Sequence, residues 1–413
     1  MRDEILSNLT NPGQLEKLYR TNRAGFKQEF AGLYPQLSGN PLAEFWHERL
    51  TFESDAISWG SKKEIFWVFL GILIAGLLAK IPAIFSIDEE FFYPRNISFI
   101  ILPLISAYFA WKNKLSSKAI AVLAGIIGIS LVYINALPGI ETDTLILACI
   151  HLPLILWGIL GTAFTGPNFL NYSKRLDFLR FNGEAAVMSI LLGLAAGAMT
   201  GITFGLFELI GIRIEEFYVN YVVAFGLPAI PILGTYLTHT NPQLVNKVSP
   251  LIAKIFSPMV LVMLIIYLGA ILFTGKDPYN DREFLLIFNL LLLGVMVLIF
   301  FSVAENFSKQ SKGSGNWILL LLSVVTVIIN GIALSAILFR ISEWGITPNR
   351  MAVLGGNILI LIHLLIVSWS IYKAVSKKAE TDDVGKKIVG YLPVYIVWTI
   401  VVVFFFPLMF GFE

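Results

Sequence analysis

The sequence predicts an all-α protein, a polytopic helical bundle that crosses a lipid bilayer about eleven times. Of its 413 residues, 56% are hydrophobic and 14% are charged, whereas soluble domains carry about 25% charged residues. Nearly everything after Lys63 consists of apolar stretches close to the roughly 20 residues that a spanning helix requires. The loops between these stretches alternate between rich and poor in lysine and arginine.

The predicted spans are 65–85, 97–111, 119–138, 145–165, 185–211, 218–240, 251–274, 284–304, 317–339, 351–372 and 388–410. Span 97–111 is short and contains Pro103, so hydropathy alone does not identify it. With the N-terminus inside, the inside segments hold 23 lysines and arginines and the outside segments hold 6. Without span 97–111, every later loop would lie on the opposite side of the membrane. The loops rich in lysine and arginine would then be outside, against the positive-inside rule. We therefore expect the N-terminus inside and the C-terminus outside.

Residues 1–64 are polar and do not resemble a cleavable signal peptide, so we divide the chain into a cytosolic amphipathic helical prefix (1–64) and a transmembrane bundle (65–413). Two helices are predicted in the prefix, beginning at Asn11-Pro12 and Asn40-Pro41, because asparagine caps helices and proline suits the first helical position. Apolar residues follow at helical spacing. They are Leu15, Leu18, Tyr19, Phe26, Phe30, Leu33 and Tyr34, then Leu42, Phe45, Trp46 and Leu50. We favour a helical pair docked on the bundle or in the headgroup region. A docking site for a cytosolic protein partner is the alternative.

Composition also limits the function classes. The single cysteine, Cys149, excludes an intramolecular disulfide and a cysteine metal cluster. The net charge of +2 is spread along the chain, which argues against nucleic-acid binding. No phosphate loop, GxSxG, GxGxxG or zinc-helix motif occurs, and His47-Glu48 lacks a following histidine. We therefore expect no cofactor and no metal, and we favour a non-enzymatic role.

Glycines recur every four residues in the fifth predicted span, at Gly193, Gly197, Gly201 and Gly205. Residues four apart lie on nearly the same side of a helix, and small residues let helices approach closely in lipid. This stripe predicts helix packing. We expect the partner to be another helix of the same chain rather than a second copy, because many helices are present.

The sixth predicted span contains Pro228 and Pro231 between Gly226 and Gly234. Each proline removes a main-chain hydrogen bond and crowds the preceding turn. Broken helices of this kind build substrate sites in transporters, but prolines also cause ordinary kinks. A kink is the favoured interpretation, since no matching pair of prolines occurs elsewhere.

His363 is the ionisable residue predicted closest to the middle of the membrane, and the ninth span carries a polar stripe of Ser323, Thr326 and Asn330. We favour hydrogen bonding between helices, because no carboxylate is predicted at that depth. A polar cavity or a proton path is the alternative. The candidate intramembrane polar site comprises His363, Asn330 and His151.

Two predicted outer loops, 277–283 and 340–350, are rich in charges and turn formers. Arg340 and Arg350 lie outside, where the positive-inside rule disfavours cations. We expect them to pair with carboxylates, with Glu343, Asp281 and Glu283 as candidates, or to bind an anionic headgroup or solute. The candidate outer-loop site comprises Arg340, Glu343, Trp344, Thr347, Arg350, Asp281, Arg282 and Glu283.

Segments 180–184, 225–231, 277–283 and 340–350 together resemble a family of bacterial multi-pass membrane proteins catalogued as a domain of unknown function. The resemblance covers about residues 60–410. Its most specific part is the Arg-Ile-Ser-x-x-Gly-x-Thr-Pro-x-Arg pattern of 340–350. The resemblance implies a multi-pass protein of the bacterial inner (plasma) membrane, and it implies no activity and no catalytic residues.

The sequence favours two classes of function. The first is a structural or regulatory role in the cell envelope, with the prefix and the outer loops as contact surfaces. The second is a transporter or permease for a small solute that uses the broken sixth span and the His363 region; an enzyme acting at the outer face is third. A water-filled cavity at mid-depth would favour transport, and a dry core would favour the structural role. The sequence does not set the oligomeric state.

Overall fold

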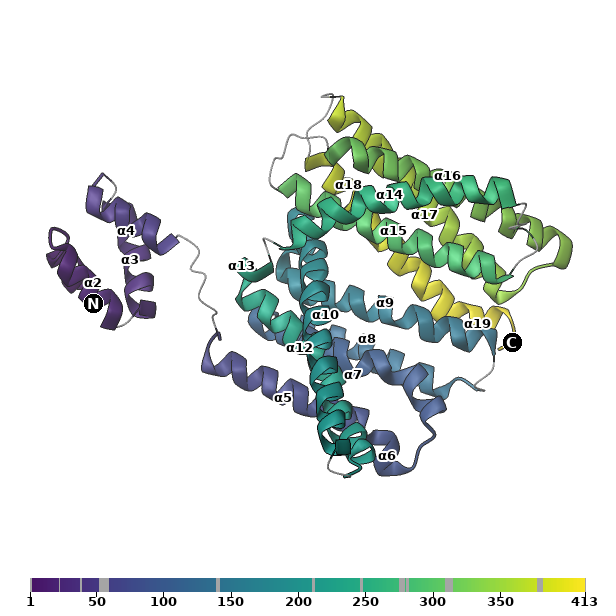
Figure 1. The fold of residues 1–413 in the computed structure, drawn as a ribbon, viewed down its shortest axis with the longest axis horizontal. Helices are drawn as coiled ribbons and strands as arrows, with labels where there is room; N and C mark the ends of the chain where they lie inside the picture. Colours follow the sequence, from purple (N-terminus) through teal and green to yellow (C-terminus); the bar gives the residue numbers. More distant parts are fainter. Residues whose placement is uncertain are drawn as a thin grey trace. The chain divides into compact units, whose positions relative to one another are not determined.

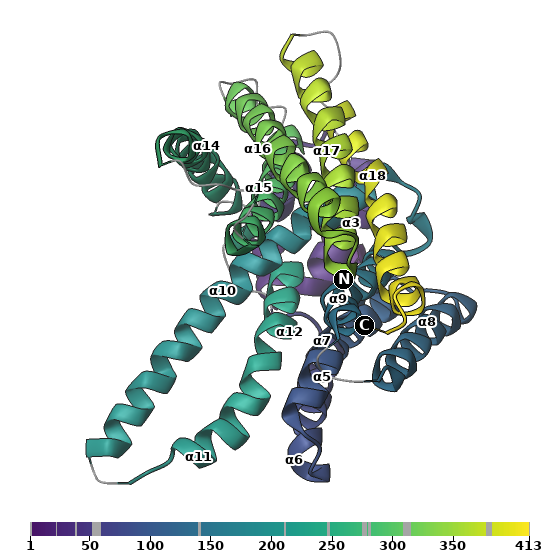
Figure 2. The same ribbon diagram turned by 90° about the vertical axis from the view of Figure 1, so that its right-hand side faces the viewer.

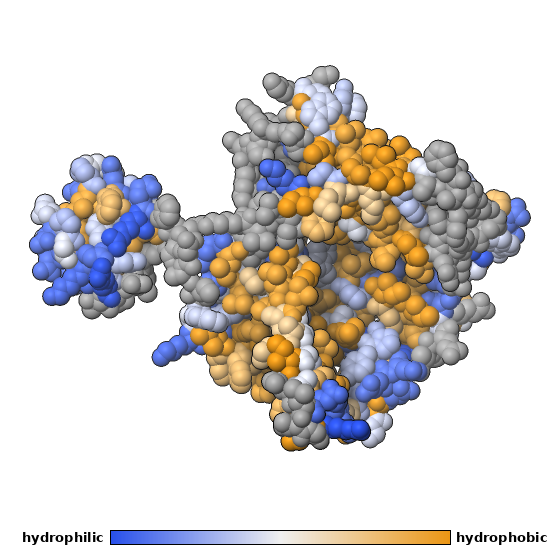
Figure 3. All heavy atoms as spheres, viewed as in Figure 1, coloured by the Kyte–Doolittle hydropathy of each residue, from blue (hydrophilic) through white to orange (hydrophobic). Residues whose placement is uncertain are grey.

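The computed structural model describes residues 2–21, 23–37, 39–51, 59–138, 142–209, 212–245, 248–274, 279, 282–308, 315–376 and 382–412. The regular structure of these described residues is entirely helical, with no strand, so the expected all-α class is confirmed. The chain divides into two compact units, Met1–Ser58 and Trp59–Glu413. Figure 3 shows that the larger unit presents a mainly apolar face, whereas the smaller unit is mainly hydrophilic.

The N-terminal unit contains α1 (Arg2–Ser7), α2 (Pro12–Thr21), α3 (Arg23–Leu37) and α4 (Pro41–Thr51) (Figure 1). The predicted cap at Asn40 is confirmed, because its side-chain oxygen accepts hydrogen bonds from the backbone N–H groups of Leu42 (3.0 Å) and Ala43 (3.2 Å). The first predicted helix is two helices instead of one. The reason lies in the apolar residues, which form a core of their own. This core contains Ile5, Leu15, Phe26, Phe30, Leu33, Ala43, Trp46 and Leu50.

The larger unit, which we call the membrane unit, contains the remaining elements. Its helices are α5 (Lys62–Ala79), α6 (Ile81–Phe85), α7 (Glu89–Lys112), α8 (Ser117–Ala136), α9 (Asp143–Thr165), α10 (Tyr172–Leu209), α11 (Glu215–Phe217), α12 (Ala224–Thr240), α13 (Pro242–Val245), α14 (Val248–Thr274), α15 (Arg282–Ser308), α16 (Gly315–Trp344), α17 (Pro348–Val375), α18 (Asp382–Ile400) and α19 (Phe406–Met409). A 3-10 turn, η1 (Gly166–Asn168), follows α9. Two π-helical segments, η2 (Tyr218–Val223) and η3 (Val401–Phe405), precede α12 and α19.

Eight helical stretches of the described residues are long and apolar enough to cross a bilayer, so the protein is an integral, multi-pass membrane protein. They belong to α8, α9, α10, η2 with α12, α15, α16, α17, and α18 with α19. The other three predicted spans also form helices, α5, α7 and α14, but α5 begins with three charged residues and α7 contains Arg95. The count of eleven spans and the orientation stay predictions.

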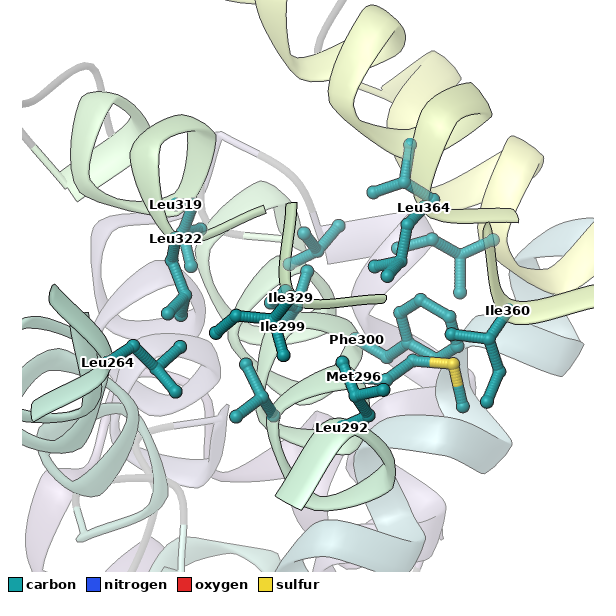
Figure 4. Packing of buried hydrophobic residues seen from close by; sticks show 14 of the residues in the cluster. Leu264, Leu292, Met296, Ile299, Phe300, Leu319, Leu322, Ile329, Ile360 and Leu364 are labelled. Carbon is teal, nitrogen blue, oxygen red and sulfur yellow. The ribbon is translucent and has the colours of Figure 1, made fainter. Parts of the chain in front are cut away.

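The core of the membrane unit consists of several clusters of buried residues, and two of these are larger than the others. One lies among α14 to α18 and is built from aliphatic side chains and Phe288 and Phe300. Figure 4 shows part of it, with Phe300, Met296, Ile360 and Leu364 side by side. The other lies among α5, α7, α9, α10 and α12, and it is richer in aromatic residues such as Phe109 and Phe178.

The sixth predicted span is not broken at its prolines. Pro228 and Pro231 both lie inside α12, which continues to Thr240. The departure from α-helical geometry comes earlier, at the π-helical η2. Neighbouring helices can compensate for the hydrogen bonds that prolines remove within a membrane helix, and α12 packs against both α5 and α10.

The glycine stripe lies on α10, which has 38 residues and extends with α11 and α12 as a long hairpin (Figure 2). A Cβ atom added at Gly197, Gly201 or Gly205 would meet no atom within 4 Å, and one added at Gly193 would meet only Ile230, at 3.9 Å. The expected packing against another described helix of this chain is therefore not made at Gly197, Gly201 and Gly205. The same stretch of α10 contacts η2 through other residues, because Thr200 and Phe204 both lie against Tyr218.

Candidate functional site

His363 lies on α17 and is completely buried. Its Nδ1 and the hydroxyl of Tyr395 on α18 are 3.1 Å apart, and that hydroxyl lies 3.5 Å from the sulfur of Met296. The ring centroids of Tyr391 and Phe300 lie 4.4 and 4.6 Å from the imidazole. The ring also lies near the main chain of Lys387 and Ile388. An aromatic shell therefore encloses His363, and no carboxylate of the described residues forms a hydrogen bond or an ion pair with it.

The polar stripe of α16 is also enclosed. Ser323, Thr326 and Asn330 are all completely buried. The hydroxyls of Ser323 and Thr326 donate to carbonyl oxygens of their own helix, at 2.8 and 2.6 Å. Neither atom of the Asn330 amide has a hydrogen-bond partner among the described residues. Because all three side chains are closed off from solvent, the stripe does not line an open channel in this structure.

His151 does not join this cluster. It lies on α9, and its Nδ1 is 2.8 Å from the carbonyl oxygen of Leu147, one turn earlier in the same helix. No hydrogen bond or ring contact among the described residues connects it to His363 or Asn330. The structure thus does not unite the three residues of the candidate intramembrane polar site.

The outer loop brings Arg340, Trp344 and Arg350 together. The guanidinium carbons of Arg340 and Arg350 lie 5.3 and 5.8 Å from the indole centroid of Trp344. Nη1 of Arg350 donates to the carbonyl oxygens of Trp344 and Gly345, both at 2.7 Å. These carbonyls end α16, where a cation compensates both the helix dipole and the unpaired acceptors. Thr347 accepts a hydrogen bond from the backbone N–H of Arg350 at 3.3 Å and begins α17.

The carboxylate partners expected for these arginines are only partly described. Glu343 is exposed and forms no ion pair with Arg340 or Arg350 within the described part of the chain. Asp281 lies outside the described residues, and α15 begins at Arg282, followed by Glu283, without described side chains. Nη1 of Arg340 is buried and has no hydrogen-bond partner among the residues described. Arg350 is thus a helix-ending residue, while the role of Arg340 stays a prediction.

A second cluster of titratable groups, which the sequence analysis missed, connects α5, α7 and α12. The buried Glu64 forms an ion pair with the half-exposed Lys112, and its carboxylate accepts a hydrogen bond from the backbone N–H of Ser61 at 2.7 Å. Ser61 in turn caps α5, as in a capping box. Burial by itself raises the pKa of Glu64, but the hydrogen bonds from Lys112 and Ser61 outweigh it and lower the pKa to about 2.

Aromatic and polar groups from α7 and α12 complete this cluster. The Tyr236 hydroxyl donates to the carbonyl oxygen of Trp59, and the Tyr108 hydroxyl lies 3.5 Å from Nδ1 of His239. The sequence contained one usable indication: Glu64, Lys112 and His239 all lie at ends of predicted spans on the predicted inside. The cluster joins three helix ends, so its clearest effect is to hold them together.

The described residues contain no group of three or more histidine, cysteine, aspartate or glutamate side chains placed to hold a metal ion. No protein-family model, curated protein or solved structure matches the chain.

Proposed function

We propose that the protein has a structural or regulatory role in the bacterial cell envelope and does not conduct a solute through its core. The observation that supports this proposal most directly is the closed environment of His363. Aromatic rings surround this residue, and the α16 stripe is buried. A conduction path would instead expose such polar residues to water at mid-depth.

The N-terminal unit supports the idea of a protein partner. Its apolar residues pack against each other, so it does not need the bilayer or another surface to bury them. Phe45 is the exception on α4, with 58% of its surface exposed. We propose that this unit binds a cytosolic partner, with Phe45 in the contact, and that the chain belongs to the uncharacterised inner-membrane family that it resembles.

Cysteine accessibility tests the closed core. In a Cys149→Ala background, we expect Ser323→Cys and Asn330→Cys to resist a water-soluble maleimide in vesicles of either orientation. Ser342→Cys lies on the same helix at an exposed position and serves as the positive control. Labelling of the cysteine at position 330 from either side would contradict the proposal and favour the transporter alternative.

The partner is tested in a strain that lacks the gene. We expect Phe45→Glu to reach normal membrane abundance but to lose rescue of the deletion defect. The control is Phe69→Tyr, a mild change at an exposed position of α5 in the membrane unit. Full rescue by Phe45→Glu would remove Phe45 from the contact.

A further inference from the structure

A groove of about 410 Å³ runs between α8, α9 and α18 and reaches the beginning of α10. Its wall is almost entirely apolar and includes Ile155, Leu392, Ile396, Val397 and Ile400. The helices α8, α9 and α18 all belong to the candidate membrane spans. Ile126, Val397 and Ile400 in its wall are exposed, so the groove opens on the outer, lipid-facing side of these helices.

Two features of α9 suit this groove to a hydrocarbon chain. Thr162 and Thr165 line it, but their hydroxyls donate to carbonyl oxygens of α9 at 3.0 and 2.8 Å. Gly158 and Gly161 let side chains of α18 and α10 pack closely on α9, since Cβ atoms there would lie 3.0 Å from Ile396 Cδ1 and 2.9 Å from Phe178 Cε1. The wall thus offers shape and apolar contact, and these two hydroxyls are already satisfied.

Among the described residues one cation, Arg175, lines the groove, at the end formed by the start of α10. Nε of Arg175 donates to the carbonyl oxygen of Phe169 at 2.7 Å, which fixes the guanidinium against the loop before α10. Arg175 forms no ion pair with a carboxylate of the described chain. Its two Nη groups therefore keep donors available, and a guanidinium presents these in the fork that matches a phosphate.

We propose that this groove binds one acyl chain of an anionic phospholipid, with the lipid phosphate held by Arg175. An apolar slot in a lipid-facing surface with a cation at one end matches a ligand that has a hydrocarbon tail and an anionic head. This end of the groove lies at the predicted inside segment 174–180, so the lipid would come from the inner leaflet. The inference goes beyond the proposed function and does not depend on it.

Native mass spectrometry of the purified full chain tests whether the site recognises an anionic lipid head group. The detergent-solubilised protein is titrated separately with phosphatidylglycerol, phosphatidylcholine and glycerol 3-phosphate. We expect one phosphatidylglycerol to bind about tenfold more tightly than phosphatidylcholine, and glycerol 3-phosphate not to bind in the same range. Arg175→Gln should remove this preference, a tenfold change that corresponds to about 1.4 kcal/mol. Lys174→Gln, at the adjacent exposed lysine, should leave it unchanged.

The tail is tested by filling the groove. Val397→Trp places a large ring in the groove, whereas Val394→Trp is a matched control on the same helix outside it. Both valines are exposed, at 60% and 38%, so both variants should fold. We expect loss of lipid binding only for Val397→Trp. The proposal would be overturned if the two lipids bound equally well. It would also be overturned if Arg175→Gln kept the preference for phosphatidylglycerol, or if Val397→Trp bound the lipid like the wild type. Tight binding of glycerol 3-phosphate would replace it with a site for free phosphate.

Discussion

Gly234 in α12 and Gly201 in α10 are both glycines within apolar helices, yet only Gly234 meets a neighbouring helix. A Cβ at Gly234 would lie 3.1 Å from the backbone nitrogen of Ser189 and 3.2 Å from its Cα. A Cβ at Gly201 would meet nothing within 4 Å. Gly201 belongs to the regular four-residue stripe, whereas Gly234 does not. Close packing in this protein therefore follows from what faces a glycine and not from the periodicity of small residues.

The largest loss of stability is expected at Gly234, where α12 lies against the backbone of α10. Gly234→Leu should destabilise the protein by about 3 kcal/mol or more, because the added side chain has to displace the main chain of α10 around Ser189. The measurement is thermal unfolding of the detergent-solubilised protein together with its abundance in the membrane. A variant that melts like the wild type would show that the α10–α12 contact is not tight.

The next largest loss of stability is expected in the cluster that joins the ends of α5, α7 and α12. Glu64→Gln should cost about 1–3 kcal/mol, since it breaks an ion pair in which Glu64 is buried and Lys112 is half-exposed. The folded pKa of about 2 lies below the ordinary 4.5. This stabilisation is therefore complete above about pH 4.5 and is lost as the pH falls from there towards 2.

The measurement for Glu64 is the stability of wild type and variant between pH 7 and pH 3. The difference in the free energy of unfolding between wild type and Glu64→Gln should narrow as the pH falls. Glu90→Gln, at an exposed residue of α7, is the control and should behave like the wild type. A gap that stays constant down to pH 3 would argue against the role given to the Glu64 carboxylate.

Arg340 and Arg350 offer a smaller contrast within one loop. Arg350→Gln should cost about 1 kcal/mol, because it removes the cation and the two hydrogen bonds that end α16. Arg340→Gln should cost less than about 0.5 kcal/mol, because its Nη1 satisfies no acceptor in the described residues. Thermal unfolding of the two variants measures both losses of stability. A larger loss for Arg340→Gln than for Arg350→Gln would assign the structural role to Arg340.

The smallest loss of stability, or even a gain, is expected on the glycine stripe. Gly197→Leu and Gly201→Leu should leave stability unchanged or raise it by up to about 1 kcal/mol, because leucine favours a helix more than glycine does. The same unfolding assay applies, with Gly234→Leu as the contrasting variant. A clear loss for either variant would reveal a packing partner for α10 outside the single chain.

Much of the fold was predictable because hydropathy and helix caps act along the chain. The described helices cover most of each predicted span, and 97–111 lies within α7. That α7 crosses the membrane stays a prediction. The caps at Asn40 and Thr347 follow from side chains close in sequence.

The sequence by itself determined that this is a multi-pass helical membrane protein, and it located many of the helices and their polar ends. Only the tertiary structure decided which helix faces meet. The spans of α8 and α9 have nearly the same mean hydropathy, but 11% of one and 50% of the other are buried. In lipid, the packed face and the lipid-facing face of a helix are equally apolar. No amphipathic pattern therefore marks the contact face, and features such as the Glu64–Lys112 pair, the open glycine stripe and the Arg175 groove emerge only when the helices are assembled.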